Sequence, residues 1–453
     1  MKLVLGKKMT VMAITAMCVF SSLSAQNVAT QQVSAAPLTL SLEDAITIAL
    51  SDNPTIKIAD QEIERVDYSK KSAWQGLLPT LDGTGQYGKY AVPGTMSLAG
   101  MKIDMPTDWT VSLGLQLALP LVAPGLWKSI QLSELEMKMA IEKARASKIT
   151  LRNEVTKAYY NILLAQDSYK VLQEGYDLAK KNYDQAKQRF EVGLVAEYDY
   201  ISAEVQMTNL QPNLLQVENG ITQAKLYLKV LMGVNMSVPL SVKGNLADYE
   251  NEVFGLNGRR DIELTNNTDL QQLDIQQQQA DKAIDLQRTQ FMPTLGAFGT
   301  YTYAGQASKA SNSLFGDRPA STDWFGQGLI VGLQLNVPIF HATTHTKLKQ
   351  LKIQANELKI QRDYLENSLT VQARTSLDNM DKAKKQVEAA KKATTLAQKS
   401  YDISAKRYET GMGIMIELNS ASLAVTQAQL AYQQAISDYL TAKADLEKTL
   451  GLD

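Results

Sequence analysis

The chain contains an internal duplication, and this feature constrains its fold more than any other. Residues 189–193 (Arg-Phe-Glu-Val-Gly) return at 407–411 (Arg-Tyr-Glu-Thr-Gly), and Leu231-Met232-Gly233 returns as Thr449-Leu450-Gly451. Gly193 and Gly411 are 218 positions apart, and so are Gly233 and Gly451. Because solenoid repeats have periods of roughly 20–50 residues, this spacing predicts two related half-molecules instead. Each half is expected to contain two alternating strands followed by a very long helix.

The first 25 residues have the pattern of a secretory signal peptide. Three lysines precede an apolar run from Met9 to about Leu23, and small residues up to Ala25 supply a cleavage site before Gln26. The run is too short to span a bilayer as a helix. Cys18, which is the only cysteine, lies in this segment, and whether it is ever lipidated stays open. The mature chain is therefore expected to lack disulfides and thiol catalysis.

The charge of the chain gives no sign of a nucleic-acid partner. The formal net charge is −1, and removing the three signal-peptide lysines makes the chain more acidic. A nucleic-acid-binding domain would carry a basic patch or stripe, and none is apparent. No later apolar run is long enough for a transmembrane helix. An exported chain of this kind is periplasmic, secreted or part of a β-barrel.

Two stretches alternate with the period of a β-strand. The odd positions from Trp109 to Leu119 are apolar, and the even positions are small or polar; the stretch from Leu329 to Val337 repeats the pattern. About ten alternating residues is the length of a tilted strand that crosses an outer membrane. Each stretch has a partner upstream, at 79–90 and 293–303. Tyrosines near the loop ends of these partners are expected to form an aromatic girdle, namely Tyr87, Tyr90, Tyr301 and Tyr303.

Four strands cannot close a membrane barrel by themselves. Membrane barrels need at least about eight strands, because an open edge in lipid leaves backbone groups unsatisfied. Three copies would supply twelve strands, which is the simplest arrangement that leaves a pore. The alternative is a pair of soluble hairpins with one buried face, but this does not account for the unbroken apolar face.

The segment after each second strand has a heptad pattern. From Leu151 to Phe190 the seam positions step by alternating fours and threes, and the seam returns 218 positions later from Leu369 to Tyr408. A strict 3.5-residue repeat predicts a left-handed coiled coil. About seventy helical residues span roughly 100 Å, a length that suits a structure crossing the periplasm. A second helix then returns to Gly233 or Gly451, which gives an antiparallel hairpin in each half.

These patterns divide the chain into eight segments. Shorter helices, at about Leu42–Leu77 and Thr268–Phe291, precede the first strand of each half, and we expect the returning helices to continue them in a bundle. The expected segments are the signal peptide 1–25, N-terminal periplasmic helices 26–78, a first barrel strand pair 79–120, a first long helical hairpin 121–233, an equatorial linker 234–266, a helix of the second repeat 267–292, a second barrel strand pair 293–338 and a second long helical hairpin 339–453.

Membrane strands, long hairpins and duplication together resemble the TolC family of outer-membrane efflux channels over essentially the whole mature chain. The most specific part of the resemblance is the sequence of the hairpin tips. Residues 189–196 with Asp199 after them look like the first tip of the family, and residues 408–411 with Glu417 after them look like the second. The resemblance implies a trimeric twelve-stranded barrel, with four strands per chain, continuous with a long α-helical coiled-coil tunnel.

The resemblance also implies a gated periplasmic entrance formed by Asp199, Tyr408 and Glu417. Three copies of Glu417 around a narrow axis would attract cations. The alternative for Glu417 is a solvated acid at a helix start, where the helix dipole favours it. The chain departs from the family at two positions: Ser420 replaces a second acid, and Gly413 stands where the family has an arginine that latches the entrance.

The turns at the two tips are the implied docking site of a periplasmic adaptor. The residues concerned are Gly193 and Leu194 in the first tip and Gly411 and Met412 in the second. Helix capping alone explains the two glycines. It does not explain the apolar residue that follows each glycine.

The implied function is the outer-membrane exit duct of a tripartite efflux pump, which passes small molecules from an inner-membrane pump and a periplasmic adaptor to the exterior. A type I protein secretion channel and a non-conducting structural coiled-coil envelope protein are the alternatives. The sequence does not identify the substrate, the pump or the adaptor.

No motif for catalysis, a cofactor or a metal is convincing. The G-x-G-x-x-G spelling at 83–88 lies inside a strand pattern, whereas dinucleotide binding requires it between a strand and a helix. His341 and His345 have a metal-ligand spacing but no third ligand within one turn. We therefore expect no enzyme activity, no cofactor and no metal.

Overall fold

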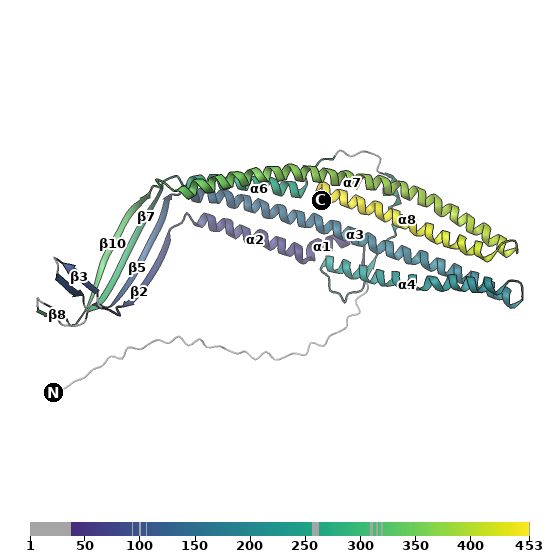
Figure 1. Ribbon diagram of the computed structural model, residues 1–453, viewed down its shortest axis with the longest axis horizontal. Helices are drawn as coiled ribbons and strands as arrows, with labels where there is room; N and C mark the ends of the chain where they lie inside the picture. Colours follow the sequence, from purple (N-terminus) through teal and green to yellow (C-terminus); the bar gives the residue numbers. More distant parts are fainter. Residues whose placement is uncertain are drawn as a thin grey trace, which may run out of the picture. The chain divides into compact units, whose positions relative to one another are not determined.

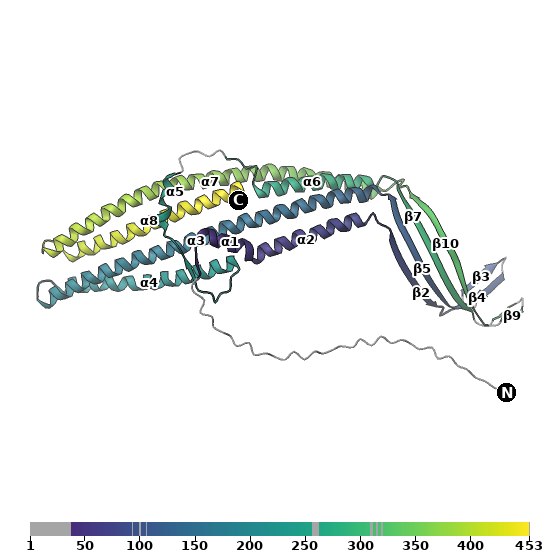
Figure 2. The ribbon, with the colours of Figure 1, turned by 180° about the vertical axis from the view of Figure 1, so that it is seen from behind.

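The computed structural model describes residues 38–92, 94–98, 101–105, 107–255, 262–308, 311–313, 316–318 and 320–452. The expected signal peptide with Cys18 lies outside the described residues, as do parts of the two loops that follow the first strand of each pair. Figures 1 and 2 show the chain from opposite sides.

Four long strands form one antiparallel sheet in the order β10-β7-β5-β2 (Figure 1). Their bounds are β2 Thr80–Lys89, β5 Thr107–Val122, β7 Thr294–Ser308 and β10 Ser321–Asn336. Each half supplies two neighbouring strands, and the halves join where β5 pairs with β7. Strands β5 and β10 have 16 residues each, so they extend beyond the alternating stretches that the sequence pattern outlined. Within the described residues, β2 and β10 each pair along one side only.

The register of the sheet places most apolar side chains of the four strands on one face, while Phe298 and Ile330 lie on the other. Leu81 lies opposite Leu117, Leu115 lies opposite Tyr301, and Leu329 also lies opposite Tyr301. This face is open: Leu113, Leu115 and Leu117 of β5 are exposed, and so are the leucines of β10. The other face pairs polar residues, for example Asp82 with Gln116. An exposed apolar face backed by a polar one is the pattern of a strand set between lipid and an aqueous lumen.

Aromatic side chains from all four strands meet at the loop end of the sheet. The ring of Trp109 lies 6.5 Å from Tyr87 and 6.2 Å from Trp324, and Trp324 stacks on Tyr303 at 5.7 Å. Trp324 also covers Gly305, where a Cβ would come within 2.5 Å of the ring. The tyrosines were expected at this level from the sequence, but the two tryptophans were not assigned to it. Such rings are typical of the membrane–water interface.

Two short hairpins occupy part of the connections at this end. They are β3 Gly94–Leu98 with β4 Met101–Met105, and β8 Ser311–Ser313 with β9 Gly316–Arg318. The Gly- and Ser-rich composition of these connections hides their strand periodicity.

The two halves contain helical hairpins of identical length. The long helices α3 Pro124–Glu191 and α7 Ala342–Glu409 have 68 residues each, and the returning helices α4 Glu197–Met232 and α8 Met415–Leu450 have 36 each. Corresponding helices begin 218 positions apart. The seam positions Val155 and Ile162 of α3 and Ala373 and Val387 of α7 are fully buried. This burial agrees with the heptad seam read from the sequence.

The short helices α2 Pro54–Gln75 and α6 Thr268–Thr289 are continued end to end by the returning helices, as Figures 1 and 2 show from both sides. The Nδ2 of Asn53 donates to the carbonyl of Leu231 at 2.6 Å, while its Oδ1 accepts the N–H of Thr55. Asn267 repeats the arrangement with the carbonyl of Thr449 at 2.7 Å. Each asparagine therefore caps one helix and binds the end of the next.

The glycine that ends each returning helix allows this close approach. Gly233 and Gly451 have φ of +67° and +69°. A Cβ on Gly451 would lie 2.1 Å from the carbonyl oxygen of Asn266, and one on Gly233 would lie 2.6 Å from that of Asp52. Only glycine satisfies both the left-handed conformation and the short distance.

The segment from Leu42 to Leu77, expected as one helix, is two helices. Helix α1 Leu42–Asp52 ends and α2 begins at Asn53-Pro54. Pro54 cannot donate a backbone hydrogen bond to α1, but it suits the first position of a new helix. The capping side chain of Asn53 completes the break.

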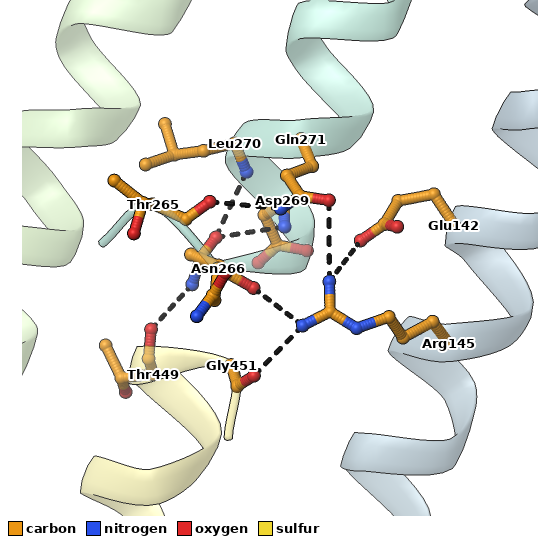
Figure 3. A network of polar contacts seen from close by, with 10 residues as sticks. Glu142, Arg145, Thr265, Asn266, Asp269, Leu270, Gln271, Thr449 and Gly451 are labelled. Atoms are coloured by element: carbon orange, nitrogen blue, oxygen red, sulfur yellow. Dashed lines mark hydrogen bonds and ion pairs between the residues drawn. The ribbon is translucent and has the colours of Figure 1, made fainter. Parts of the chain in front are cut away.

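Arg145 of α3 binds the joint between α6 and α8 (Figure 3). Its Nη2 donates to the carbonyls of Asn266 and Gly451, at 3.0 Å each, and its Nη1 donates to Glu142 at 3.0 Å. The first half-molecule is thus tied to the joint of the second. The repeat-equivalent position in α7 is Asp363, so this bond has no counterpart there.

The segment between the halves forms a collar, defined here as β6 Leu240–Val242, the 3-10 helix η1 Leu246–Tyr249 and α5 Glu250–Gly255. Strand β1 Leu38–Leu40 pairs in parallel with β6. The carboxylate of Asp167 in α3 accepts the N–H of Leu246 at 2.8 Å, and Glu250 accepts from Tyr432 of α8 at 2.7 Å and from Lys391 of α7. The collar therefore binds both hairpins.

Candidate functional site at the hairpin tips

The turns at the two tips have the same backbone structure. Gly193 and Gly411 have φ of +73° and +77°. In the first tip the N–H of Leu194 donates to the carbonyl of Arg189 at 2.8 Å, and in the second the N–H of Met412 donates to that of Arg407 at 2.8 Å. This is the Schellman pattern of helix termination. It leaves the following apolar side chains outside: Leu194 is 74% exposed and Met412 is 70% exposed.

Near the tips the two hairpins share one hydrophobic core. Its buried members come from all four helices of the hairpins: Ala186, Ala203, Tyr401, Tyr408, Met415, Leu418, Ala421 and Val425. A polar contact lies beside this core, where the Nδ2 of Asn419 approaches the Oγ of Ser202 at 3.4 Å. The two tips of one chain are therefore packed on each other.

Arg189 of the first tip binds the backbone of the second tip. Its Nη1 donates to the carbonyl of Tyr408 at 2.8 Å, and its Nη2 donates to the carbonyl of Glu409 at 2.9 Å. Its guanidinium carbon also lies 4.8 Å from the centre of the Tyr408 ring, within cation–π range. In the sequence, Arg189 belongs to the repeated motif and to the stretch that resembles the first tip of the family, and neither pattern predicts this contact. Nothing in a sequence pattern indicates an acceptor that is a backbone carbonyl in the other hairpin.

Tyr408 is one of the three expected entrance residues, and it is buried. Its side chain is 3% exposed, and its hydroxyl has no hydrogen-bond partner in the described part of the chain. Burial raises the pKa of this hydroxyl, the charge of Asp199 raises it further, and Arg189 opposes the shift. The structure therefore brings Asp199 near Tyr408, although the two are not hydrogen-bonded.

Glu417, the third expected entrance residue, is paired with an arginine of its own tip. It lies in the first turn of α8, and its carboxylate is 3.4 Å from Arg407. Arg407 also donates to the carbonyl of Met412 at 3.3 Å. Both side chains of the pair are about half exposed, so the pair is worth less than about 1 kcal/mol. The acid at the second tip nevertheless has a counter-ion beside it.

Gly413 is tightly enclosed by the last turn of α7. Its N–H donates to the carbonyl of Arg407 at 3.0 Å, and a Cβ at this position would lie 3.0 Å from the backbone nitrogen of Tyr408. A side chain here would press on that turn. Gly413 has no side chain that could reach the other tip. Any arginine contact between the tips must therefore come from another position.

A groove of about 380 Å³ lies between the starts of α4 and α8. Its lining is mainly apolar and includes Ser420. The lining residues that face each other at helical spacing are Tyr198, Ile201 and Val205 of α4 and Ile416, Ser420 and Leu423 of α8.

Within the described part of the chain, no group of three His, Cys, Asp or Glu side chains is placed to hold a metal ion. Among the helices that the structure describes, none combines the length and the apolar character needed to cross a membrane.

Comparison with known proteins identifies the class. The chain belongs to the outer membrane efflux protein family, which matches residues 45–234 and 260–452. The two matched segments correspond to the two half-molecules. The protein is thus an outer-membrane efflux channel of the TolC type, and its helical tunnel lies in the periplasm.

Individual relatives are distant but cover most of the chain. The alkaline protease secretion protein AprF of Pseudomonas aeruginosa is 22% identical over 420 residues, which are 91% of this chain and 85% of AprF. The outer membrane protein TolC of Vibrio cholerae is 22% identical over 351 residues, 75% of this chain and 76% of TolC. The structure of the Campylobacter jejuni CmeC outer membrane channel superposes with a TM-score of 0.71 at 17% identity, covering 90% of this chain and 85% of CmeC.

These findings confirm the fold class expected from the sequence: a duplicated half-molecule, with four barrel strands per chain in a trimeric barrel that continues into a helical tunnel. Channels of this family are homotrimers that work with an adaptor and an inner-membrane pump.

Proposed function

We propose that this chain is the exit duct of a tripartite efflux pump that carries small molecules, served by its own periplasmic adaptor and inner-membrane pump. The proposal rests on two features that occur together in one chain. A sheet with an exposed apolar face and two open edges is joined to 68-residue helices that end in exposed apolar tips. The sheet suits a lipid bilayer, and the tips suit docking at the other end of a tunnel.

The open edges support closure by copies of the same chain. In lipid, the unpaired backbone groups of β2 and β10 would each cost several kcal/mol. If β2 of one subunit pairs with β10 of the next, both edges are satisfied. Three subunits then give the twelve-stranded barrel.

Asp199, Tyr408 and Glu417 form the periplasmic entrance in this proposal. All three lie at the hairpin tips, and the charge of Asp199 acts on the pKa of Tyr408. Three copies of Glu417 around the axis would favour cations. Because Arg407 lies beside each Glu417, the selectivity should be weaker than that of an unpaired acidic ring.

The exposed turn residues support docking of an adaptor at the tips. Gly193 and Gly411 set the turns, and Leu194 and Met412 extend beyond them into solvent. Two large apolar side chains so fully exposed on adjoining turns favour a protein contact. In the assembled pump these residues would be covered.

Protein secretion is the second candidate function. The observation in its favour is the similarity to AprF, whose name assigns it to secretion of an alkaline protease. In either case the chain acts as a conduit, its energy comes from the pump, and it catalyses no reaction itself.

Complementation tests the proposal. The chain would be expressed, together with the adaptor and pump genes of its source, in a Gram-negative host that lacks its own efflux channels. Lower accumulation of a fluorescent dye, reversed by an uncoupler, supports small-molecule efflux. Unchanged dye accumulation together with export of a protein substrate would support the secretion candidate instead.

A further inference from the structure

We propose that Arg189 is the positioning residue that holds the two hairpin tips of each subunit together and thereby keeps the entrance narrow. The inference rests on the proposed entrance, and it assigns the restraint to a residue outside the expected set of Asp199, Tyr408 and Glu417. The positions that the bond connects are separated by 219 and 220 residues, so it links the two half-molecules directly.

The acceptors of Arg189 are groups that a helix end leaves free. The last four carbonyls of α7 have no partner within the helix. The Schellman turn uses those of Lys406, Arg407 and Tyr408, and Arg189 takes the carbonyl of Glu409 and shares that of Tyr408. A cation at a helix C-terminus is also favoured by the helix dipole. The planar guanidinium presents two donors in a fixed fork that matches two adjacent carbonyls, whereas a lysine ammonium has no such fixed pair.

The repeat provides an internal comparison. Arg407 stands 218 positions after Arg189, in the equivalent turn, and has the same backbone around it. Its side chain contacts its own tip, where it pairs with Glu417 and donates to the carbonyl of Met412. Two equivalent arginines therefore have different partners, and only that of the first tip crosses to the other hairpin.

Tyr408 contributes through its ring and its carbonyl. The guanidinium carbon of Arg189 lies over the ring, and the hydroxyl has no partner in the described residues. The ring is also part of the core that both hairpins share. Separation of the tips therefore requires both bonds of Arg189 to break and the Tyr408 ring to leave that core.

The test combines a distance measurement with conductance. Spin labels on Leu194→Cys and Met412→Cys report the separation of the tips, in trimers with a minority of labelled subunits. The variant is Arg189→Gln. The matched control is Lys187→Gln, which removes a charge from an exposed residue in the same turn. Resting conductance of each protein is measured in a planar bilayer.

We expect Arg189→Gln to broaden and lengthen the distance distribution and to raise resting conductance roughly tenfold, because two charge-assisted hydrogen bonds are lost. Arg189→Lys, which keeps the charge but loses the fork, should fall between wild type and Arg189→Gln in both readouts. Lys187→Gln should match wild type.

Unchanged tip distances in Arg189→Gln trimers would overturn the proposal that Arg189 holds the two tips together. A change of equal size in Lys187→Gln would also overturn it, since the effect would then be one of charge alone. If the role of Arg189 is refuted in this way while the wild type still conducts, the proposed channel function is unaffected. Absence of any conducting state in the wild type and in Arg189→Gln would count against the entrance itself.

Discussion

The side-chain amide of Asn267 donates to the carbonyl of Thr449 at 2.7 Å, across 182 positions of the chain. The same side chain accepts the N–H groups of Asp269 and Leu270 at the start of α6. One buried residue thus caps a helix and fastens the end of another. Asn53 does the same in the first half, so both half-molecules are assembled around this joint.

Asn267→Ala should lower the free energy of unfolding by about 2–3 kcal/mol, because it removes a cap and leaves the buried carbonyl of Thr449 without that donor. The thermal unfolding midpoint of the purified protein measures this. Asn367→Ala, at an exposed asparagine of α7, is the control and should change the midpoint little. Equal shifts in both variants would show that the joint does not stabilise the fold.

Two glycine substitutions should have opposite effects on stability. Gly451→Ala should destabilise the protein, because a Cβ there would lie 2.1 Å from the carbonyl oxygen of Asn266 and the φ is +69°. Gly220→Ala should stabilise it by about 0.5–1 kcal/mol, since this position is inside α4 and nothing lies within 4 Å of the added carbon. Unfolding midpoints that move in the same direction would contradict the geometry of the joint.

Tyr408→Phe should leave resting conductance unchanged, because the hydroxyl makes no hydrogen bond within the described residues and the ring stays in place. Tyr408→Leu should raise it, because the surface under Arg189 and part of the shared core are lost. Bilayer recordings of the two variants measure the difference. An increase with Tyr408→Phe would mean that the hydroxyl finds a partner in the closed trimer.

Changes at the Arg407–Glu417 pair should move ion selectivity in opposite directions. Glu417→Gln removes the acid from the entrance and should reduce the preference for cations. Arg407→Gln removes the counter-ion that lies 3.4 Å away and should increase it. Reversal potentials in a salt gradient measure both effects. If neither variant shifts the reversal potential, Glu417 does not line the pore.

Stability at acidic pH should depend on Glu250 in the collar. Hydrogen bonds from Lys391 and from Tyr432 lower the pKa of this carboxyl below its ordinary value of 4.5. A carboxyl whose folded-state pKa is depressed contributes stability that is complete above the unfolded-state pKa and is lost as the pH falls through the folded-state pKa. The wild type should therefore lose its stability advantage over Glu250→Gln as the pH falls below about 4.5. Unfolding midpoints that remain a constant interval apart from pH 7 to pH 3 would refute this.

Periodicity in the sequence predicted the large elements, because burial requires it. The buried seam positions of α3 and α7, such as Val155 and Val387, follow the heptad, and the exposed leucines of β5 and β10 follow the alternation. The break between α1 and α2 could also have been predicted, since Asn53-Pro54 supplies both a helix cap and a helix breaker. The periodic pattern on both sides of it concealed the break.

The contacts at the site could not be predicted from the sequence. Arg189 binds carbonyls, and every residue has a carbonyl, so no side-chain pattern marks its partner. The pairing of Glu417 with Arg407 depends on how the turn around Gly413 folds back on α7. The resemblance to the family predicted the entrance residues Asp199, Tyr408 and Glu417. The contacts of Arg189 and Arg407 at the tips are seen only in the structure.

The most direct test of the account is the single-channel conductance of the purified trimer in a planar bilayer, with and without a divalent cation on the periplasmic side. Small, cation-selective currents that the divalent ion reduces from that side only are the expected result. An anion-selective current, or no current from inserted trimers of both the wild type and Arg189→Gln, would contradict a channel with an acidic entrance at the hairpin tips.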